Sequence, residues 1–240
     1  MKREKLLIHK YRQMLDGCDF LKDLGKESSN SLLSMFKEEN WSKNTCILNH
    51  NKLSYKFHII LSGRIKMYQV DPVTGKELTL FLLTKGDVFD VFCLLDGQEH
   101  TVYYECLDNV CVLAAPMPKL RGWLKNNPDH YKNLLPYAGK QLRMLENSVS
   151  EMTFTNISTR LLKLLIRNVN ENSHDLELID DLPNKEIANL LGSTRAVINR
   201  HLQQLKKNGS IRLSRNKMEV KDLGILIHLL ECQQKLMNEK

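Results

Sequence analysis

Two hydrophobic periodicities divide the chain into regions of different structure. Between Trp41 and about Pro116, apolar side chains recur at every second position, most clearly at Tyr55, Phe57, Ile59 and Leu61. A period of two is typical of β-strands with one buried face. Four glycines that mark turns follow one another at intervals of 11 to 12 residues, at positions 63, 75, 86 and 97. Short strands separated by turns at this spacing predict an antiparallel β-roll or barrel.

Helices are predicted on both sides of this β-region. Residues from Met1 to about Glu39 are expected to be largely helical, and Asn127 is expected to cap the start of a second helix. Along that helix, apolar residues step by four, three, four and three positions, at Ala138, Leu142, Leu145, Val149 and Met152. This spacing is typical of a coiled-coil seam. The stripe could also pack as ordinary core within its own chain. Because it is narrow and lies on a long helix between two domains, we predict a dimer interface.

The C-terminal third has the succession of elements that forms a winged helix-turn-helix. Helices are expected at about residues 157–168, 185–191 and 195–208, with a tight turn at Gly192 and Ser193. A hairpin with strands at residues 211–213 and 218–220 follows, and then an amphipathic helix that begins near residue 223. Two helices joined by a short turn with glycine form the helix-turn-helix layout, in which the second helix enters the major groove of DNA.

Positive charge is concentrated in this same region. The chain has 240 residues and a formal net charge of +7. From Leu182 to Lys221 there are nine basic and two acidic residues, so this segment accounts for the whole net charge. A basic run by itself is usually a solvated helix face. Here it coincides with the turn, the second helix and the hairpin, which predicts binding to DNA.

The outward face of the second helix offers side chains suited to DNA. Arg195 and Arg200 are expected to contact bases, because one guanidinium can bind both O6 and N7 of guanine. Ser193, Thr194 and Asn199 are expected to contact bases or phosphates near the helix start. Contacts to phosphate alone are expected from the basic residues of the helix end and the hairpin, namely Lys206, Lys207, Arg212 and Arg215.

Composition argues against several other classes of protein. No apolar run approaches the ~18 residues of a membrane-spanning helix, and the N-terminus carries no apolar segment of secretory length. Six cysteines are too few for a disulfide scaffold, so a reducing, cytoplasmic location is expected. No paired-carboxylate, nucleophile–base or phosphate-loop motif stands out, and we predict no enzymatic activity.

Four stretches of the sequence together resemble a known family. They are Leu61–Tyr68, Gly86–Asp87, Asn127–Arg160 and the motif from Glu186 to Arg200. On these residues the chain is similar, over nearly its whole length, to the Crp/Fnr family of bacterial transcription regulators. The resemblance implies an α+β protein with a β-roll effector domain of the cyclic-nucleotide-binding, jelly-roll type at residues 1–126. A dimerisation helix at 127–153 and a winged helix-turn-helix at 154–240 would follow.

The resemblance also implies partners. The protein is expected to form a homodimer and to bind double-stranded DNA at a near-palindromic operator. Its half-sites would lie about one helical turn, ~34 Å, apart. RNA polymerase is expected as a further partner.

Residues that bind cyclic AMP in this family are replaced here. The resemblance puts Val91 near the position of the glutamate that holds the ribose, and His100 at that of the arginine that holds the phosphate. A neutral imidazole does not replace a bidentate guanidinium, so cyclic AMP is not expected to bind. The candidate effector pocket is either filled by its own side chains, which we favour, or binds another apolar ligand. Its residues are Phe89, Val91, Phe92, His100, Thr101 and Leu145.

The second helix of the motif departs from the family as well. Family members often carry a glutamate that accepts from a cytosine amine, and this chain has Ala196 there. Asn199 could read an adenine instead. The operator is therefore expected to differ from the family's usual consensus.

No cofactor or metal is predicted. The first forty residues contain only Cys18, and Cys46 follows far off, so the closely spaced thiolates of an iron–sulfur cluster are missing. His50, His58 and His100 could ligate haem in principle, but a lone histidine on a strand is more often a polar surface residue. No spacing typical of a zinc site is found.

Three alternatives stay open. Cys106 and Cys111 would face each other across a hairpin turn at Asp108 and Asn109, which would allow a redox switch, although two small buried hydrophobes are the more common reading. A regulatory module that binds a cyclic nucleotide and acts through proteins is the second alternative. A haem or redox sensor that still binds DNA is the third.

Overall fold

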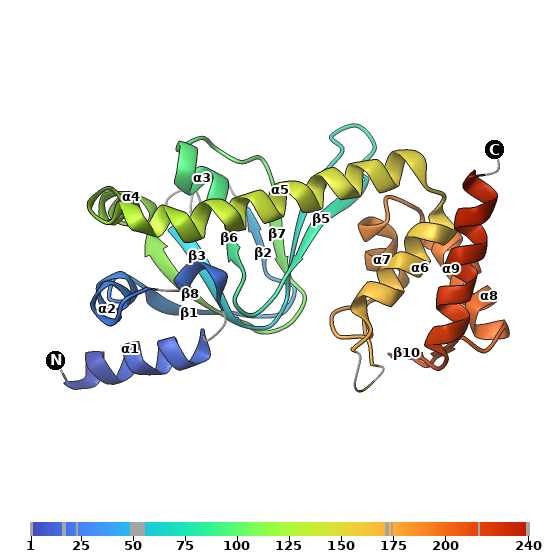
Figure 1. Ribbon diagram of the computed structural model, residues 1–240, viewed down its shortest axis with the longest axis horizontal. Coiled ribbons are helices and arrows are strands. Elements are labelled where there is room, and N and C mark those ends of the chain that lie inside the picture. Colours follow the sequence, from blue (N-terminus) through green and yellow to red (C-terminus); the bar gives the residue numbers. More distant parts are fainter. Residues whose placement is uncertain are drawn as a thin grey trace. The chain divides into compact units, whose positions relative to one another are not determined.

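The computed structural model describes residues 2–15, 18–22, 24–48, 56–170, 173, 175–215 and 217–238. The chain forms two compact units. The first contains residues 1–69 and 80–144, and the second contains residues 70–79 and 145–240. The long helix α5 (Tyr131–Phe154) contributes residues to both units (Figure 1).

Strands dominate the first unit and helices flank them. The helices are α1 (Lys2–Met14), α2 (Lys26–Leu33), α3 (Val91–Asp96) and α4 (Met117–Asn126), with short 3₁₀ turns at Asp19–Leu21 and Pro128–His130. The strands are β1 (Lys37–Trp41), β2 (Cys46–Leu48), β3 (Lys56–Ser62), β4 (Ile65–Val70), β5 (Glu77–Leu83), β6 (Val88–Phe89), β7 (Tyr103–Cys106) and β8 (Val110–Pro116). The expected N-terminal helical region is therefore too long, because helix ends at Leu33 and β1 already begins at Lys37.

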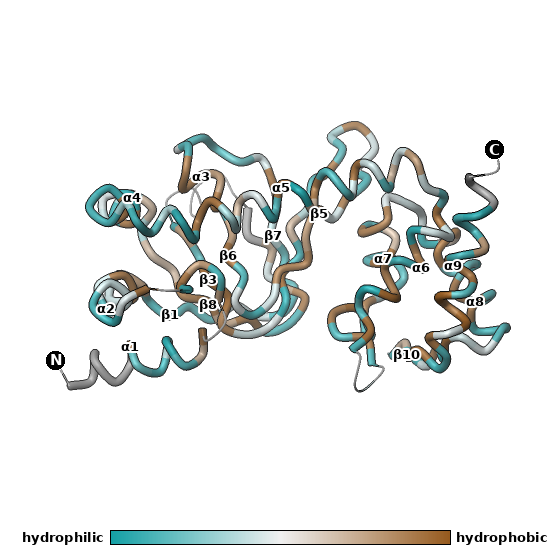
Figure 2. The backbone as a smooth tube through the Cα atoms, viewed as in Figure 1, coloured by the Kyte–Doolittle hydropathy of each residue, from teal (hydrophilic) through white to brown (hydrophobic). Residues whose placement is uncertain are grey.

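The strands form two four-stranded sheets, with the orders β1-β8-β3-β6 and β2-β7-β4-β5. Figure 2 shows hydrophobic residues concentrated along these strands. The expected antiparallel β-roll is confirmed, and the expected turn glycines all have positive φ. Gly63 has a second constraint, because a Cβ there would lie 2.7 Å from the carbonyl oxygen of Asn109. The glycine thus lets two turns at one end of the roll approach closely.

The alternative in which Cys106 faces Cys111 across a hairpin turn is not what the structure shows. Cys106 lies on β7 opposite Ile65 of β4, whereas Cys111 lies on β8 opposite Asn40 of β1. The two strands belong to different sheets, so the segment between them carries the chain from one sheet to the other instead of closing a hairpin. Both thiols are free, and burial raises the pKa of Cys106 to about 11. This geometry does not support a redox switch between them.

The start of α5 also differs from expectation. Asn127 does not cap a following helix through its side chain, because its Nδ2 donates to the carbonyl of Trp123 at the end of α4. The part of α5 in the first unit buries Leu134, Tyr137 and Ala138. The Tyr137 hydroxyl donates to the carbonyl of Val88 and accepts from its N–H, which ties α5 to β6.

The second unit contains the elements expected of a winged helix-turn-helix. They are α6 (Ile157–Asn168), α7 (Asn184–Leu190), α8 (Arg195–Lys207), β9 (Ile211–Leu213), β10 (Met218–Val220) and α9 (Leu223–Asn238). Local caps explain where α6 and α8 begin, since Asn156 accepts from the N–H of Thr159 and Thr194 accepts from that of Val197. In the described part of the chain, no helix is both long and apolar enough to cross a membrane.

Candidate nucleic-acid interface and sensor site

The turn between α7 and α8 sets the position of the second helix. Gly192 has φ of 60°, and the N–H of the next residue, Ser193, donates to the carbonyl of Ala188 at 2.9 Å. Ile198 and Leu202 are buried on the inner side of α8, while Ile187 and Ala188 are buried on α7. These apolar contacts leave the opposite side of α8 facing solvent.

That solvent-facing side carries the residues predicted to contact DNA. Thr194, Arg195, Asn199 and Arg200 are exposed, and Ser193 is half-buried in the turn. The Thr194 hydroxyl accepts from the N–H of Val197 at 3.4 Å, so it caps the helix and keeps its hydrogen for a donor contact. The structure therefore brings these residues together on one helix start, as expected.

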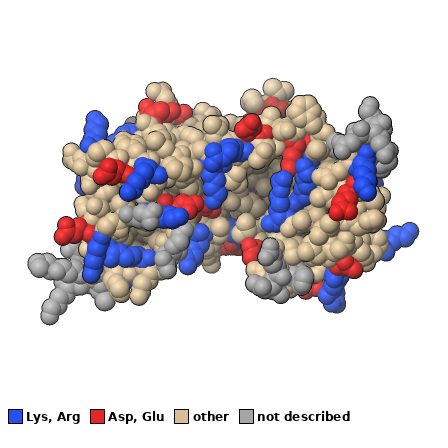
Figure 3. Space-filling view, viewed as in Figure 1, with Lys and Arg blue, Asp and Glu red and all other residues tan. Residues whose placement is uncertain are grey.

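The basic residues of the helix end and the wing are exposed too. They are Lys206, Lys207, Arg212 and Arg215. Within the described residues, neither these four nor Arg195 and Arg200 form an ion pair, so their charges are available to an anion. On the first unit, at the left of Figure 3, basic and acidic side chains are interspersed. The six unpaired basic residues of α8 and the wing all belong to the second unit.

Lys217 differs from the other basic residues of the wing. Its Nζ lies 3.3 Å from a carboxylate oxygen of Glu219 and 3.5 Å from one of Asp175. The hydrogen bond with Glu219 raises the pKa of Lys217, so its charge is already balanced by its neighbours. Arg212 and Arg215 are consequently the better candidates for phosphate contacts.

A depression of about 500 Å³ lies between α8, the wing and the start of α7. Arg195, Asn199 and Arg215 line it, and so do two residues that the sequence reasoning missed, Asn184 and Gln203. Asn184 donates from Nδ2 to Oδ1 of Asn199 at 3.2 Å. Gln203 follows Arg195 and Asn199 at intervals of four residues, and this helical spacing could have identified it.

Two of the six residues predicted to line the effector pocket are packed into the interior. Phe89 and Val91 are each about 1% exposed, and Phe92 is half-buried. The Phe89 ring stacks on His58, with ring centroids 4.5 Å apart, and packs against Tyr104 at 4.8 Å. Thr101 is exposed, and Leu145 is half-buried in the second unit, so its place in a pocket stays a prediction.

The histidines differ from the expected polar surface residues. His58 is 1% exposed, and burial, followed by the charge of Lys56, lowers its pKa to about 3. It therefore stays neutral and serves as an aromatic core residue. His100 is half-buried, with Nδ1 3.9 Å from Oδ1 of Asp90. His50 lies outside the described residues.

Exposed apolar residues follow α5. Leu135, Leu142 and Val149 are 55%, 61% and 64% exposed and recur at intervals of seven residues. Of the other predicted interface residues, Leu145 and Met152 are half-buried, while Ala138 is buried within its own unit. The predicted dimer interface stays a prediction, and the exposed apolar row of α5 that is available to it consists of Leu135, Leu142 and Val149.

Each of the two units contains a match to a known domain family. The cyclic nucleotide-binding domain family matches residues 38–127, and the Crp-like helix-turn-helix domain family matches residues 159–229. The CRP-like cAMP-activated global transcriptional regulator of Mycobacterium tuberculosis is 26% identical over 171 residues, which are 70% of this chain and 76% of that protein. A global nitrogen regulator of Synechocystis is 27% identical over 171 residues, covering 69% and 76%.

Solved structures share the fold. A CooA mutant from Carboxydothermus hydrogenoformans superposes with a TM-score of 0.68 at 23% identity, covering 83% of this chain and 90% of that one. The two curated relatives carry names that refer to different signals, so similarity at this level leaves the effector open. Both domain matches, their order along the chain and the fold agree, and the protein belongs to the Crp/Fnr family of helix-turn-helix transcription regulators.

Proposed function

We propose that the protein is a homodimeric transcription regulator that binds a near-palindromic DNA operator. In this proposal α8 contacts the bases, and the wing contacts the flanking phosphates. The observation that carries this proposal is a set of exposed basic side chains on α8 and the β9–β10 hairpin that make no ion pair among the described residues, namely Arg195, Arg200, Lys206, Lys207, Arg212 and Arg215. Such a surface attracts a polyanion, and exposed arginines at a helix start can read guanine. We propose no catalytic role.

Partners and location follow from this role. The exposed seam on α5 supports association of two copies, and a two-fold dimer matches a palindromic site. RNA polymerase is proposed as a partner on the basis of the family alone. Because the proposed target is chromosomal DNA, the proposed location is the cytoplasm.

Selection of binding sites from a random duplex library tests the proposal. We expect the enriched duplexes to contain an inverted repeat whose half-sites are about one helical turn, ~34 Å, apart. Footprinting on the selected site should protect both half-sites. Enrichment of no sequence, or of single unrepeated sites, would contradict a symmetric operator.

The effector is proposed not to be cyclic AMP. Val91 is buried in the apolar core of the first unit, so it offers no polar atom to a ribose. His100 lies near the carboxylate of Asp90, which would repel a phosphate at that place.

The thermal unfolding temperature of the protein tests whether cyclic AMP binds. We expect cyclic AMP at millimolar concentration to leave the unfolding temperature unchanged, because a ligand stabilises only the state that it binds. The selected operator duplex serves as a positive control and should raise the same temperature. A dose-dependent rise with cyclic AMP would favour the alternative of a cyclic-nucleotide module.

A further inference from the structure

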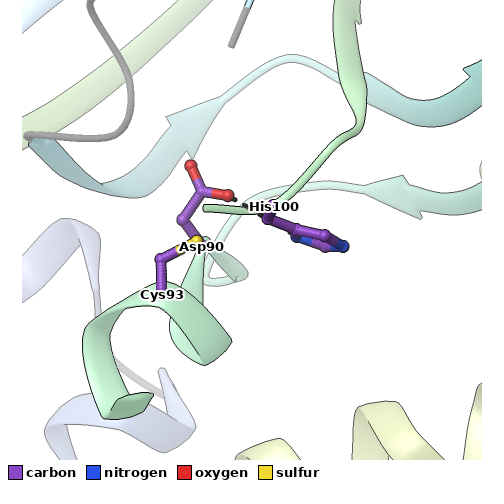
Figure 4. Close-up of side chains that lie close together, drawn as sticks. All are labelled: Asp90, Cys93 and His100. Carbon is purple, nitrogen blue, oxygen red and sulfur yellow. Dashed lines mark ion pairs between the residues drawn. The ribbon is translucent and has the colours of Figure 1, made fainter. Parts of the chain in front are cut away.

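Three side chains capable of binding a metal meet at the N-terminal end of α3. Asp90 immediately precedes this helix and Cys93 lies in its first turn, while His100 comes from the loop that leads to β7. One ligand atom from each residue lies within 4.8 Å of the other two. Figure 4 shows the carboxylate, the thiol and the imidazole of this cluster.

Asp90 is a buried acidic residue with an unusual backbone conformation. It is 4% exposed and has φ of 65°, a left-handed conformation that glycine adopts routinely and Asn and Asp only occasionally. Its Oδ1 accepts a hydrogen bond from the Tyr104 hydroxyl at 2.7 Å. Its Oδ2 is buried and has no hydrogen-bond partner among the described residues. A buried carboxylate oxygen in this state favours a positive ligand.

Backbone carbonyls of α3 bind one cationic side chain near the cluster. The guanidinium of Arg121 donates to the carbonyls of Cys93 and Leu94. His100 packs its ring edge-on against Phe92, with centroids 6.2 Å apart, which helps to orient the imidazole.

We propose that Asp90, Cys93 and His100 bind one divalent transition-metal ion, with Zn²⁺ as the best match. A carboxylate oxygen, a thiolate and an imidazole are all accepted ligands of Zn²⁺, and in a tetrahedral site their atoms would lie about 3.3–3.8 Å apart. The observed separations require only an approach of about an ångström. The hydrogen bond from Tyr104 to Oδ1 is the kind of outer support that orients a ligating carboxylate.

Charge balance also suits a divalent ion. On binding, the Cys93 thiol loses its proton to solvent, and the thiolate and the Asp90 carboxylate together neutralise the two positive charges. Three protein ligands leave the fourth tetrahedral position for water or a small exogenous ligand. Sequence reasoning missed this cluster because the three residues follow no familiar metal-binding spacing, and the loop before β7 brings His100 back to the helix.

Cobalt titration of the metal-free, full-length protein tests the site. We expect one Co²⁺ per chain, with a thiolate-to-cobalt absorption band that disappears when Zn²⁺ is added. The substitutions Cys93→Ser, Asp90→Asn and His100→Gln should each weaken binding by about 100-fold or more, since even outer-shell changes cost about 10- to 100-fold. Cys111→Ser, a cysteine of the same unit outside the cluster, is the matched control and should leave the titration unchanged.

Tyr104→Phe keeps the test decisive if a ligand variant fails to fold. It removes only the hydroxyl that supports Asp90 and should weaken cobalt binding about ten-fold. Absence of the band in the wild-type protein, a band that persists in Cys93→Ser, or unchanged affinity in Tyr104→Phe would overturn the proposal. The titration uses no DNA, so its outcome is independent of the operator selection.

Discussion

Replacing Arg200 by alanine is expected to weaken operator binding by about 1–3 kcal/mol, or roughly 5- to 150-fold, and to relax base preference at one position of each half-site. Arg200 is exposed on α8 and forms no ion pair among the described residues, so the substitution removes a free guanidinium without disturbing a packed contact. The measurement is a set of gel-shift affinities for the operator and its single-base variants.

Arg215→Ala is the matched control for this prediction. The residue is an exposed arginine of the wing, and we expect it to touch only phosphate. Its removal should weaken binding to specific and random duplexes about equally, and the slope of affinity against salt should fall by about one. If both arginine variants lower specific and random binding alike, α8 does not read bases through Arg200.

Introducing a glutamate at Leu142 is expected to convert the dimer into a monomer and to reduce operator affinity by about 10²- to 10⁴-fold. Two-fold symmetry would place two such charges in one apolar seam, where neither would have a partner. Operator affinity falls because a monomer binds only one half-site. In the dimer, binding of one subunit raises the effective concentration of the other subunit at the second half-site, and a monomer lacks this gain. Light scattering of Leu142→Glu after size separation reports the mass, and gel shift reports the affinity.

Asn147→Glu provides the control on the same helix. Asn147 is exposed on α5 and lies five residues beyond Leu142, away from the row that contains Val149. It adds the same charge without entering the proposed seam, so the dimer and its affinity should persist. Because Leu142 is mostly exposed within one chain, its substitution should not unfold the monomer. A Leu142→Glu protein that remains dimeric at micromolar concentration would exclude this seam.

The sheet topology of the first unit could not be predicted from the sequence. Period-two alternation and turn glycines predict short antiparallel strands, but they do not say which strands share a sheet. Cys106 and Cys111 illustrate this, because they are close in sequence and lie on strands of different sheets. His58 sits on a strand where a polar outer face was expected, yet both neighbouring aromatic rings and its own burial make it part of the core.

By itself, the sequence determined the winged helix-turn-helix and the position of the residues predicted to contact DNA. The physical reason is that caps such as Thr194, a positive-φ turn at Gly192 and helical periodicity act over a few neighbouring residues. Only the tertiary structure decided that Ala138 is buried in its own unit and that Asp90, Cys93 and His100 converge. Those facts depend on how segments distant in the sequence pack together. The pattern of residues along the chain does not give the spatial distance between such segments.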